Sequence, residues 1–278
     1  MFPYLFLGSL ALFCPACSSN DNADAPSPGK LYQKGEYIYR IHNETLFNIP
    51  AAQTQSQELY PWEEKHIGEH SKITKEFFRC KGGNLNPMRT TQEKGELVRC
   101  FDCGGAEKHS LPLRDNKEFI YPILLELVNY IQTKTQKKVV ITSGHRCPEH
   151  NVYVDPSPSN RYSKHMLGAE VSFYVQGMEH RPEEIVKYIQ EYYKITPKYQ
   201  GRKECLEFAR YEKEDVNVSI PPWYNKEIFI KLYKPKEGRN FDNRHPYPYL
   251  SIQVRFDYDL QEKVVYSWDK ANHNYHRH

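Results

Sequence analysis

The stretch Ser163-Lys164-His165-Met166-Leu167-Gly168-Ala169-Glu170-Val171-Ser172-Phe173 decides the fold of this 278-residue chain. A histidine lies in the short segment before Gly168, which marks a turn, and residues 169–175 then form a predicted strand. Side chains two residues apart in a strand share a face, so Glu170 and Ser172 are expected on one face. The stretch therefore predicts a histidine beside a polar strand face.

The elements around this stretch alternate between helices and strands. Apolar residues recur at helical spacing from Phe119 to Ile131, with Pro122 tolerated in the first turn. A second helix is expected to open at Arg181-Pro182-Glu183-Glu184. Strands are predicted at 139–143, 228–233 and 249–257. In the last of these, apolar residues alternate with Ser251 and Gln253, the pattern of a half-buried strand.

The N-terminus indicates export. Its first 13 residues are apolar and shorter than the roughly 20 that span a bilayer, so residues 1–16 are predicted to be a signal peptide. Ala16 before Cys17, and the polar linker at 17–30, resemble a bacterial lipoprotein signal with Cys17 lipidated. An ordinary cleaved signal is the alternative. We expect a periplasmic protein or a lipoprotein anchored in the inner or outer membrane.

Charge and cysteine content restrict the partners further. A net charge of +3, from 38 basic and 35 acidic residues without a basic stripe, argues against nucleic acid. Residues 31–115 are expected to form an irregular N-terminal layer with a strand at 36–40. In an exported protein, cysteines are expected to form disulfides, with the pairing left open. The cysteines in question are Cys80, Cys100, Cys103, Cys147 and Cys205. The alternative is a Cys₃His zinc site made from Cys80, Cys100, Cys103 and His109.

Three segments in order resemble the M15 family of zinc D-Ala-D-Ala carboxypeptidases: Ile141-Thr142-Ser143-Gly144-His145-Arg146, Ser163–Gly168 and Tyr249–Arg255. That family shares its fold with the amino-terminal domain of hedgehog proteins. The resemblance covers residues 116–258 and implies an α+β fold. A hedgehog/DD-peptidase-like antiparallel sheet with flanking helices is then expected over residues 116–262.

The resemblance assigns a role to several residues. A hydrolytic zinc site needs three protein ligands and an open position for water. His165 matches the first ligand, and Ser163 and Gly168 match the positions that flank it. Arg146 matches the arginine of the family's Ser-Gly-x-Arg turn, which steadies an oxyanion or a substrate carboxylate. Ser143 begins that turn.

The rest of the expected metal site has been replaced. Ser172 stands at the aspartate ligand, Ser251 at the second histidine ligand, and Gln253 at the carboxylate two residues later. The residues that could rebuild a metal site with His165 are Glu170, His245 and His145. Glu170 stands two residues before the ligand position at Ser172, which is about 6.6 Å along a strand. At that distance we expect its side chain to lie too far away to share a metal with His165.

We therefore expect a degenerate M15-like groove that binds peptidoglycan stem peptide, or a related peptide, without hydrolysing it and without a cofactor. Arg146 and Gln253 hold the catalytic positions. Arg146 is expected to pair with a ligand carboxylate. Hydrogen bonds are expected from His165, Gln253, Ser143, Ser163, Ser172 and Ser251.

Two alternatives stay open. The first is an active zinc D,D-carboxypeptidase or endopeptidase with rearranged ligands. The second is a disulfide-stapled structural lipoprotein of the envelope that binds protein partners. The tail at 263–278 carries histidines, and its last residues, Asn272–His278, are expected to form a disordered terminus.

Overall fold

The computed structural model describes residues 66–93, 96–157, 162–213 and 215–278. The expected signal peptide, Cys17, the linker and the strand at 36–40 lie outside the described residues. No helix in the described ranges is both long and apolar enough to cross a membrane.

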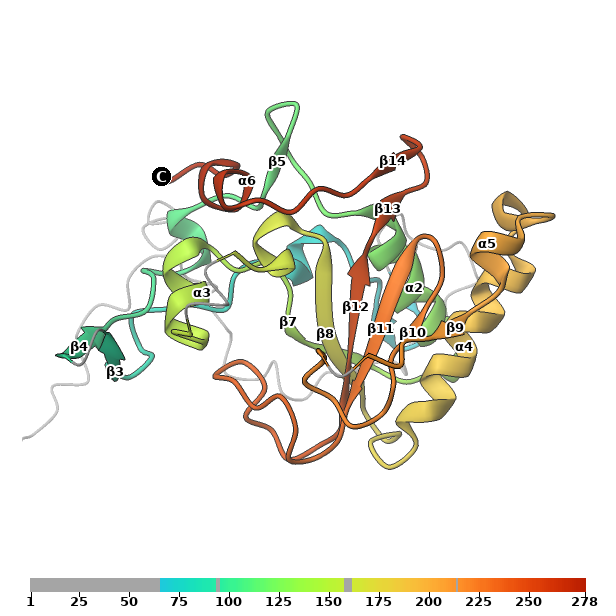
Figure 1. Ribbon diagram of the computed structural model, residues 1–278, viewed down its shortest axis with the longest axis horizontal. Helices are drawn as coiled ribbons and strands as arrows, with labels where there is room; N and C mark the ends of the chain where they lie inside the picture. The colour runs from blue at the N-terminus through green and yellow to red at the C-terminus, as the bar shows by residue number, and fades with distance from the viewer. Residues whose placement is uncertain (1–65, 94–95, 158–161, 214) are drawn as a thin grey trace, which may run out of the picture. The chain divides into compact units, whose positions relative to one another are not determined.

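A six-stranded antiparallel sheet forms the centre of the described part (Figure 1). In spatial order its strands are β7 (Val139–Ser143), β8 (Glu170–Val175), β12 (Tyr249–Val254), β11 (Ile228–Tyr233), β10 (Trp223–Tyr224) and β9 (Ala209–Arg210). The protein is thus α+β, as predicted, and the strands expected at 139–143 and 228–233 are confirmed. The strand expected at 249–257 is divided into β12 and β13 (Phe256–Asp257).

Helices α2 (Pro122–Thr135) and α4 (Pro182–Ile195) pack against the sheet and against each other. Both begin with proline at the first helical position, where a missing N–H costs no hydrogen bond. Their apolar faces are buried as predicted: Leu124, Leu127 and Ile131 join Ile185 and Ile189 in the main core.

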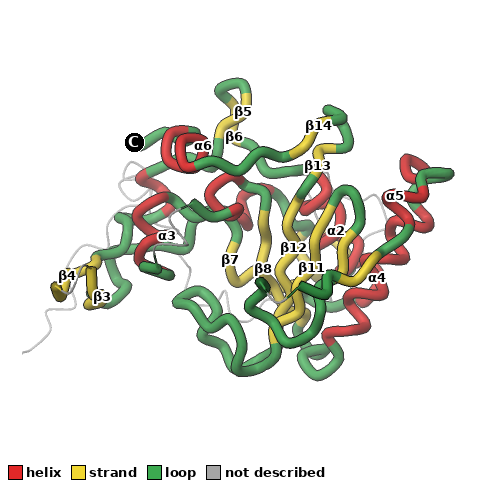
Figure 2. The backbone as a smooth tube through the Cα atoms, in the orientation of Figure 1, coloured by secondary structure: helices red, strands yellow, loops and turns green. Residues whose placement is uncertain are grey.

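The remaining elements are short, and Figure 2 shows the segments between them as loop. Before α2 they are the paired strands β1 (His66–Ile67) and β2 (His70–Ser71), β3 (Arg89–Glu93) and β4 (Glu96–Cys100), β5 (Leu113–Arg114) and β6 (Lys117–Glu118), with 3₁₀ helices η3 (Lys75–Phe78) and η4 (Ala106–Lys108). After α2 they are α3 (Pro148–Val154), η6 (Lys164–Leu167), η7 (Pro197–Tyr199), α5 (Lys203–Leu206), β14 (Glu262–Lys263) and α6 (Trp268–His273).

The register of β8 and β12 creates a polar patch on the sheet. Ser172 lies opposite Ser251, and Glu170 lies opposite Gln253. The alternate residues of both strands, such as Val171 and Ile252, join the core with α2 and α4. All six residues of β12 are buried, so the prediction of a half-buried strand is wrong. Loop residues on the polar side, among them Asn217, Asn240 and Asn243, form the walls of a pocket over that face.

The C-terminal tail is part of the fold, and the prediction that it is disordered is wrong. Its backbone pairs with the segment before α2: the Ser110 amide donates to the His276 carbonyl over 2.8 Å, and the Leu113 amide to the Asn274 carbonyl over 2.6 Å. Tyr275 packs against the cluster of Cys80, Cys103 and Cys147. These contacts supply hydrogen-bond partners that composition alone cannot reveal.

Candidate functional site

His165 is fixed by the turn that carries it. The Ser163 hydroxyl caps η6 by accepting from the His165 amide over 3.3 Å. Gly168 ends η6 at φ +65°, and a Cβ there would lie 2.9 Å from the Phe119 carbonyl oxygen, so only glycine fits. His165 Nδ1 lies 2.7 Å from the Gly144 carbonyl oxygen. With Nδ1–H donated to that carbonyl, Nε2 is left to face Ser172 and Glu170.

The carboxylate of Glu170 occupies the middle of the polar patch. Its Oε1 accepts hydrogen bonds from Ser251 Oγ over 2.5 Å and from Gln253 Nε2 over 2.9 Å. The same oxygen lies 3.7 Å from His165 Nε2, and Ser172 Oγ lies 3.5 Å from that nitrogen. Of the two residues at expected ligand positions, Ser251 on β12 therefore binds a carboxylate, and Ser172 on β8 faces His165.

The expectation that Glu170 lies too far from His165 is wrong. It measured distance along one strand, whereas the Glu170 side chain extends across the sheet between two strands about 4.8 Å apart. Serines at 172 and 251 are small enough to leave that space open. Lys164 completes the arrangement, because its ammonium group donates to the Gln253 amide oxygen.

Charges in the patch favour an ionised carboxylate beside a neutral imidazole. Burial lowers the pKa of His165 to about 4. Burial alone would raise the pKa of Glu170, but His165, Lys164 and the hydrogen bonds from Ser251 and Gln253 outweigh it and lower this pKa to about 2. Glu170 is therefore ionised at neutral pH.

Arg146 is held by a buried acid. After Ile141 the pairing of β7 with β8 shifts register, and the chain leaves the sheet through Ser143 toward Arg146. Arg146 Nε donates to Ser143 Oγ over 2.8 Å and to Asp242 Oδ2 over 2.9 Å. Neither Nη nitrogen of Arg146 has a hydrogen-bond partner among the described residues. The guanidinium is thus anchored through Nε, and its other nitrogens remain available.

A pocket of about 170 Å³ contains these groups. Its lining includes six residues that the sequence singled out: Arg146, Ser163, His165, Glu170, Ser172 and Gln253. Two expected residues do not line it: Ser251 donates to Glu170, and the Ser143 hydroxyl is held between Arg146 and Asp242. Lys231 and Asp155 add one charge of each sign to the walls. The sequence reasoning did not find Asp242 or Lys231, because both come from segments outside the matched motifs.

The other two candidate metal ligands lie elsewhere. The His145 ring packs edge-on against His109, with ring centres 5.9 Å apart. The His245 ring lies among Tyr174, Tyr247 and Tyr249. No group of three candidate ligands in the described ranges includes His165.

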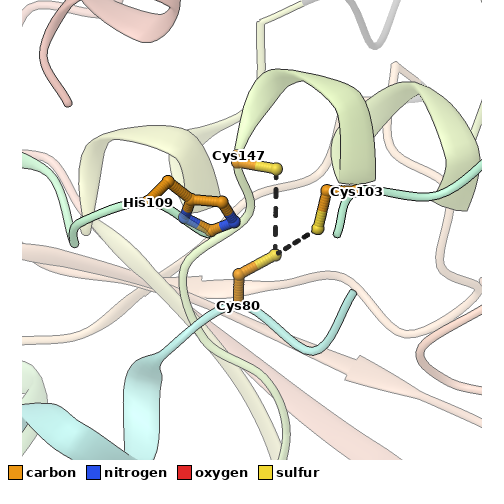
Figure 3. A group of neighbouring side chains, drawn as sticks. All are labelled: Cys80, Cys103, His109 and Cys147. Atoms are coloured by element: carbon orange, nitrogen blue, oxygen red, sulfur yellow. Dashed lines mark hydrogen bonds between the residues drawn. The ribbon is translucent and has the colours of Figure 1, made fainter. Parts of the chain in front are cut away.

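A second cluster brings together Cys80, Cys103, His109 and Cys147, all at most 6% exposed (Figure 3). One ligand atom from each residue lies within 4.8 Å of the others, so the cluster could hold a metal ion. The Cys80 sulfur lies 3.9 Å from that of Cys103 and 4.0 Å from that of Cys147. The expected disulfides are not present among the described residues.

This cluster differs from the zinc site considered from sequence in one ligand. Cys100 ends β4 and stays outside, and Cys147 takes its place. In the sequence, the loops that carry Cys80 and Cys103 are marked by the glycine pairs that follow them, Gly82-Gly83 and Gly104-Gly105. Gly83 and Gly105 pair through a backbone bridge. Cys147 had no such signal, since it stands at the N-cap of α3.

The thiols of the cluster interact strongly. Hydrogen bonds from Cys147 and Cys80 lower the pKa of Cys103, with a smaller contribution from the Gly105 amide. Burial raises the pKa of Cys80 to about 12, and the hydrogen bond with Cys103 raises that of Cys147. The three thiols are therefore close enough to shift one another's pKa, downward for Cys103 and upward for Cys80 and Cys147.

A chain of buried ion pairs joins the cluster to the pocket. Asp102, next to Cys103, lies 2.7 Å from His150 Nδ1, and His150 Nε2 lies 3.0 Å from Asp242. Asp242 then pairs with Arg146. Burial lowers the pKa of His150, but hydrogen bonds and charges of the two aspartates outweigh it and raise this pKa to about 9. Asp102, Cys103 and His150 also form a possible set of metal ligands, but the Asp102–His150 pair already satisfies both partners.

Comparison of this chain with protein-family models, with curated proteins and with solved structures gives no match.

Proposed function

We propose that this protein binds a peptide through its terminal carboxylate in the pocket over β8 and β12, and does not hydrolyse it. The observation that carries the proposal is the position of Glu170. Its carboxylate takes hydrogen bonds from Ser251 and Gln253, the positions that the M15 resemblance assigns to a metal ligand and an acid. An internal carboxylate thus satisfies these groups where a hydrolase would need metal and water.

The hydrogen-bonding groups that remain unpaired in the pocket suit the carboxyl end of a peptide. The Nη nitrogens of Arg146 suit a carboxylate, because a guanidinium binds carboxylates with two parallel hydrogen bonds. Glu170 Oε2 has no hydrogen bond among the described residues and would accept an amide N–H. A volume of about 170 Å³ suits one or two small residues. Peptidoglycan stem peptide, which ends in D-alanine, has this chemistry, and the expected export of the protein would bring the two together.

The rearranged-enzyme alternative lacks support from geometry. A hydrolytic zinc site requires three protein ligands. His165 and Glu170 supply two ligand atoms, while His145 and His245 lie in other parts of the fold.

The test uses diacetyl-lysyl-D-Ala-D-Ala and the same peptide with an amidated C-terminus. Calorimetry should show that the free acid binds roughly 10- to 100-fold more tightly, since a charge-assisted hydrogen bond contributes about 1.5–3 kcal/mol. Mass spectrometry should find both peptides intact after incubation with Zn²⁺. Equal affinity for acid and amide would contradict carboxylate recognition. Release of D-alanine would contradict the non-hydrolytic assignment.

A further inference from the structure

We propose that Cys80, Cys103, His109 and Cys147 bind one structural Zn²⁺ ion, at a site separate from the peptide pocket. Cysteine sulfur and histidine nitrogen in a closed set of four are the donors typical of structural zinc. All four side chains point toward one centre in Figure 3.

The distances between the sulfurs match tetrahedral coordination. With Zn–S bonds of about 2.3 Å, two sulfurs of a tetrahedron are ~3.8 Å apart. The Cys80 sulfur lies 3.9 and 4.0 Å from the sulfurs of Cys103 and Cys147. A disulfide would bring one pair to about 2.05 Å and leave the third thiol and the Nε2 of His109 buried without a partner. One zinc ion satisfies all four residues.

His109 provides evidence independent of the cysteines. Its Nδ1 lies 3.3 Å from the Ser110 carbonyl oxygen, whereas its Nε2 is buried and has no hydrogen-bond partner. An unpaired buried nitrogen of this kind is costly in a folded protein. Donation of Nδ1–H to a backbone carbonyl is also the usual way in which a ligating histidine is oriented, with the lone pair of Nε2 directed at the metal.

The backbone around the ligands is shaped for the cluster. A Cβ at Gly82 would lie 2.1 Å from the Cys103 sulfur, so the chain passes too close to the ligand for any other residue. The His150 amide donates to the Cys147 sulfur over 3.4 Å, and such amide contacts stabilise a metal-bound thiolate.

The zinc ion joins three segments that are far apart in the sequence. Cys80 follows η3, Cys103 and His109 flank η4, and Cys147 caps α3, directly after Arg146. Tyr275 of the tail covers the cluster. Short loops of this kind bury too little apolar surface to hold themselves, and a metal replaces the missing core.

The test begins with the wild-type full-length chain, purified without added metal or chelator. Elemental mass spectrometry should find about one zinc per chain. Peptide mapping after alkylation in denaturant should find Cys80, Cys103 and Cys147 as thiols. Exchange with Co²⁺ should give thiolate charge-transfer bands and the intense d–d bands of a tetrahedral site. A disulfide between any two of these cysteines, or reduced thiols that take up no Zn²⁺, overturns the proposal.

Two matched variants locate the ion. Cys147→Ser should lose zinc while keeping the helix cap, because serine is a preferred N-cap residue. Cys100→Ser removes the other cysteine of the Cys100-Phe101-Asp102-Cys103 motif and should keep zinc. Full zinc in Cys147→Ser, or its loss in Cys100→Ser, overturns the ligand set. These readouts are independent of peptide binding, so the zinc site and the proposed function can fail separately.

Discussion

Two buried glutamates should respond in opposite directions to the same Glu→Gln substitution. Glu227 is 2% exposed, and its Oε2 accepts hydrogen bonds from Tyr193 and Tyr199 over 2.9 and 2.7 Å. Burial raises the pKa of Glu227 to about 7, although those hydrogen bonds oppose the change. The folded protein therefore holds this proton more tightly than the unfolded chain. The stability that Glu227 contributes is complete below about pH 4.5 and is lost as the pH rises through 7.

The magnitude follows from the two pKa values. The difference between 4.5 and about 7 corresponds, at about 1.4 kcal/mol for each pH unit, to roughly 3 kcal/mol of unfolding free energy. Glutamine imitates the protonated acid, so Glu227→Gln should recover about 3 kcal/mol at pH 8 and almost nothing at pH 4. For a domain of this size, the gain at pH 8 would raise the melting temperature by roughly 6 to 12 °C.

Glu170→Gln should destabilise the protein instead. The Glu170 carboxylate accepts from Ser251 and Gln253, and hydrogen bonds to a charged group contribute about 1.5–3 kcal/mol each. Glutamine keeps one acceptor oxygen and loses the charge, so we expect a loss of about 2–3 kcal/mol at pH 7. Because the pKa of Glu170 is lowered to about 2, its contribution is present above about pH 4.5. That contribution is lost as the pH falls toward 2, and the variant should then approach the wild type.

Urea unfolding at pH 4, 7 and 8, followed by tyrosine and tryptophan fluorescence, measures the wild type and both variants. Glu126→Gln is the control, since Glu126 also accepts from a tyrosine, Tyr192, but lies near the surface beside Lys198. It should change stability by less than about 1 kcal/mol. A loss of stability in Glu227→Gln at pH 8, or an unchanged Glu170→Gln at pH 7, would refute the assignment of a neutral core acid and an ionised pocket acid.

Three further outcomes follow from the same contacts. Gly82→Ala should reduce zinc content, since its Cβ would lie 2.1 Å from the Cys103 sulfur. Gly83→Ala should keep zinc, because a Cβ at that position has no neighbour within 4 Å. Equal zinc content in the two variants would contradict the steric argument. Removal of zinc by a strong chelator should lower the melting temperature measured by calorimetry, and an unchanged melting temperature would show that the ion is not structural. Asp242→Asn should lower the unfolding free energy measured in urea by about 3–5 kcal/mol, because it leaves the buried Arg146 without its ion-pair partner. The same variant should weaken peptide binding. A fully stable variant would show that the ion pair is dispensable.

The regular elements were readable in the sequence because their patterns are local. Helical spacing of apolar residues predicted α2, a proline followed by two glutamates predicted the start of α4, and β-branched runs predicted β7 and β11. The alternation of apolar and polar residues in β12 gave the correct faces. It gave the wrong burial, because loops from other parts of the chain cover the polar face.

The site was predicted only in part for the same reason. His165, Ser172, Ser251 and Gln253 are predicted to lie together. The antiparallel register of β8 and β12 brings the last three together, and η6 holds His165 beside Ser172. The proximity of Glu170 to His165 cannot be predicted from β8 alone, because the direction of the Glu170 side chain depends on the space between β8 and β12.

The sequence by itself determined which residues are polar on the central strands, where the helices lie, and that histidine and cysteine are available as ligands. Only the tertiary structure decided how they combine. It replaced the expected disulfides with a cluster of Cys80, Cys103, His109 and Cys147. It also brought the carboxylate of Glu170 to 3.7 Å from His165 Nε2 and into a hydrogen bond with Ser251. The physical reason is that ligand sets and ion pairs require atoms within a few ångströms, and segments distant in sequence meet at that range only after the core has formed.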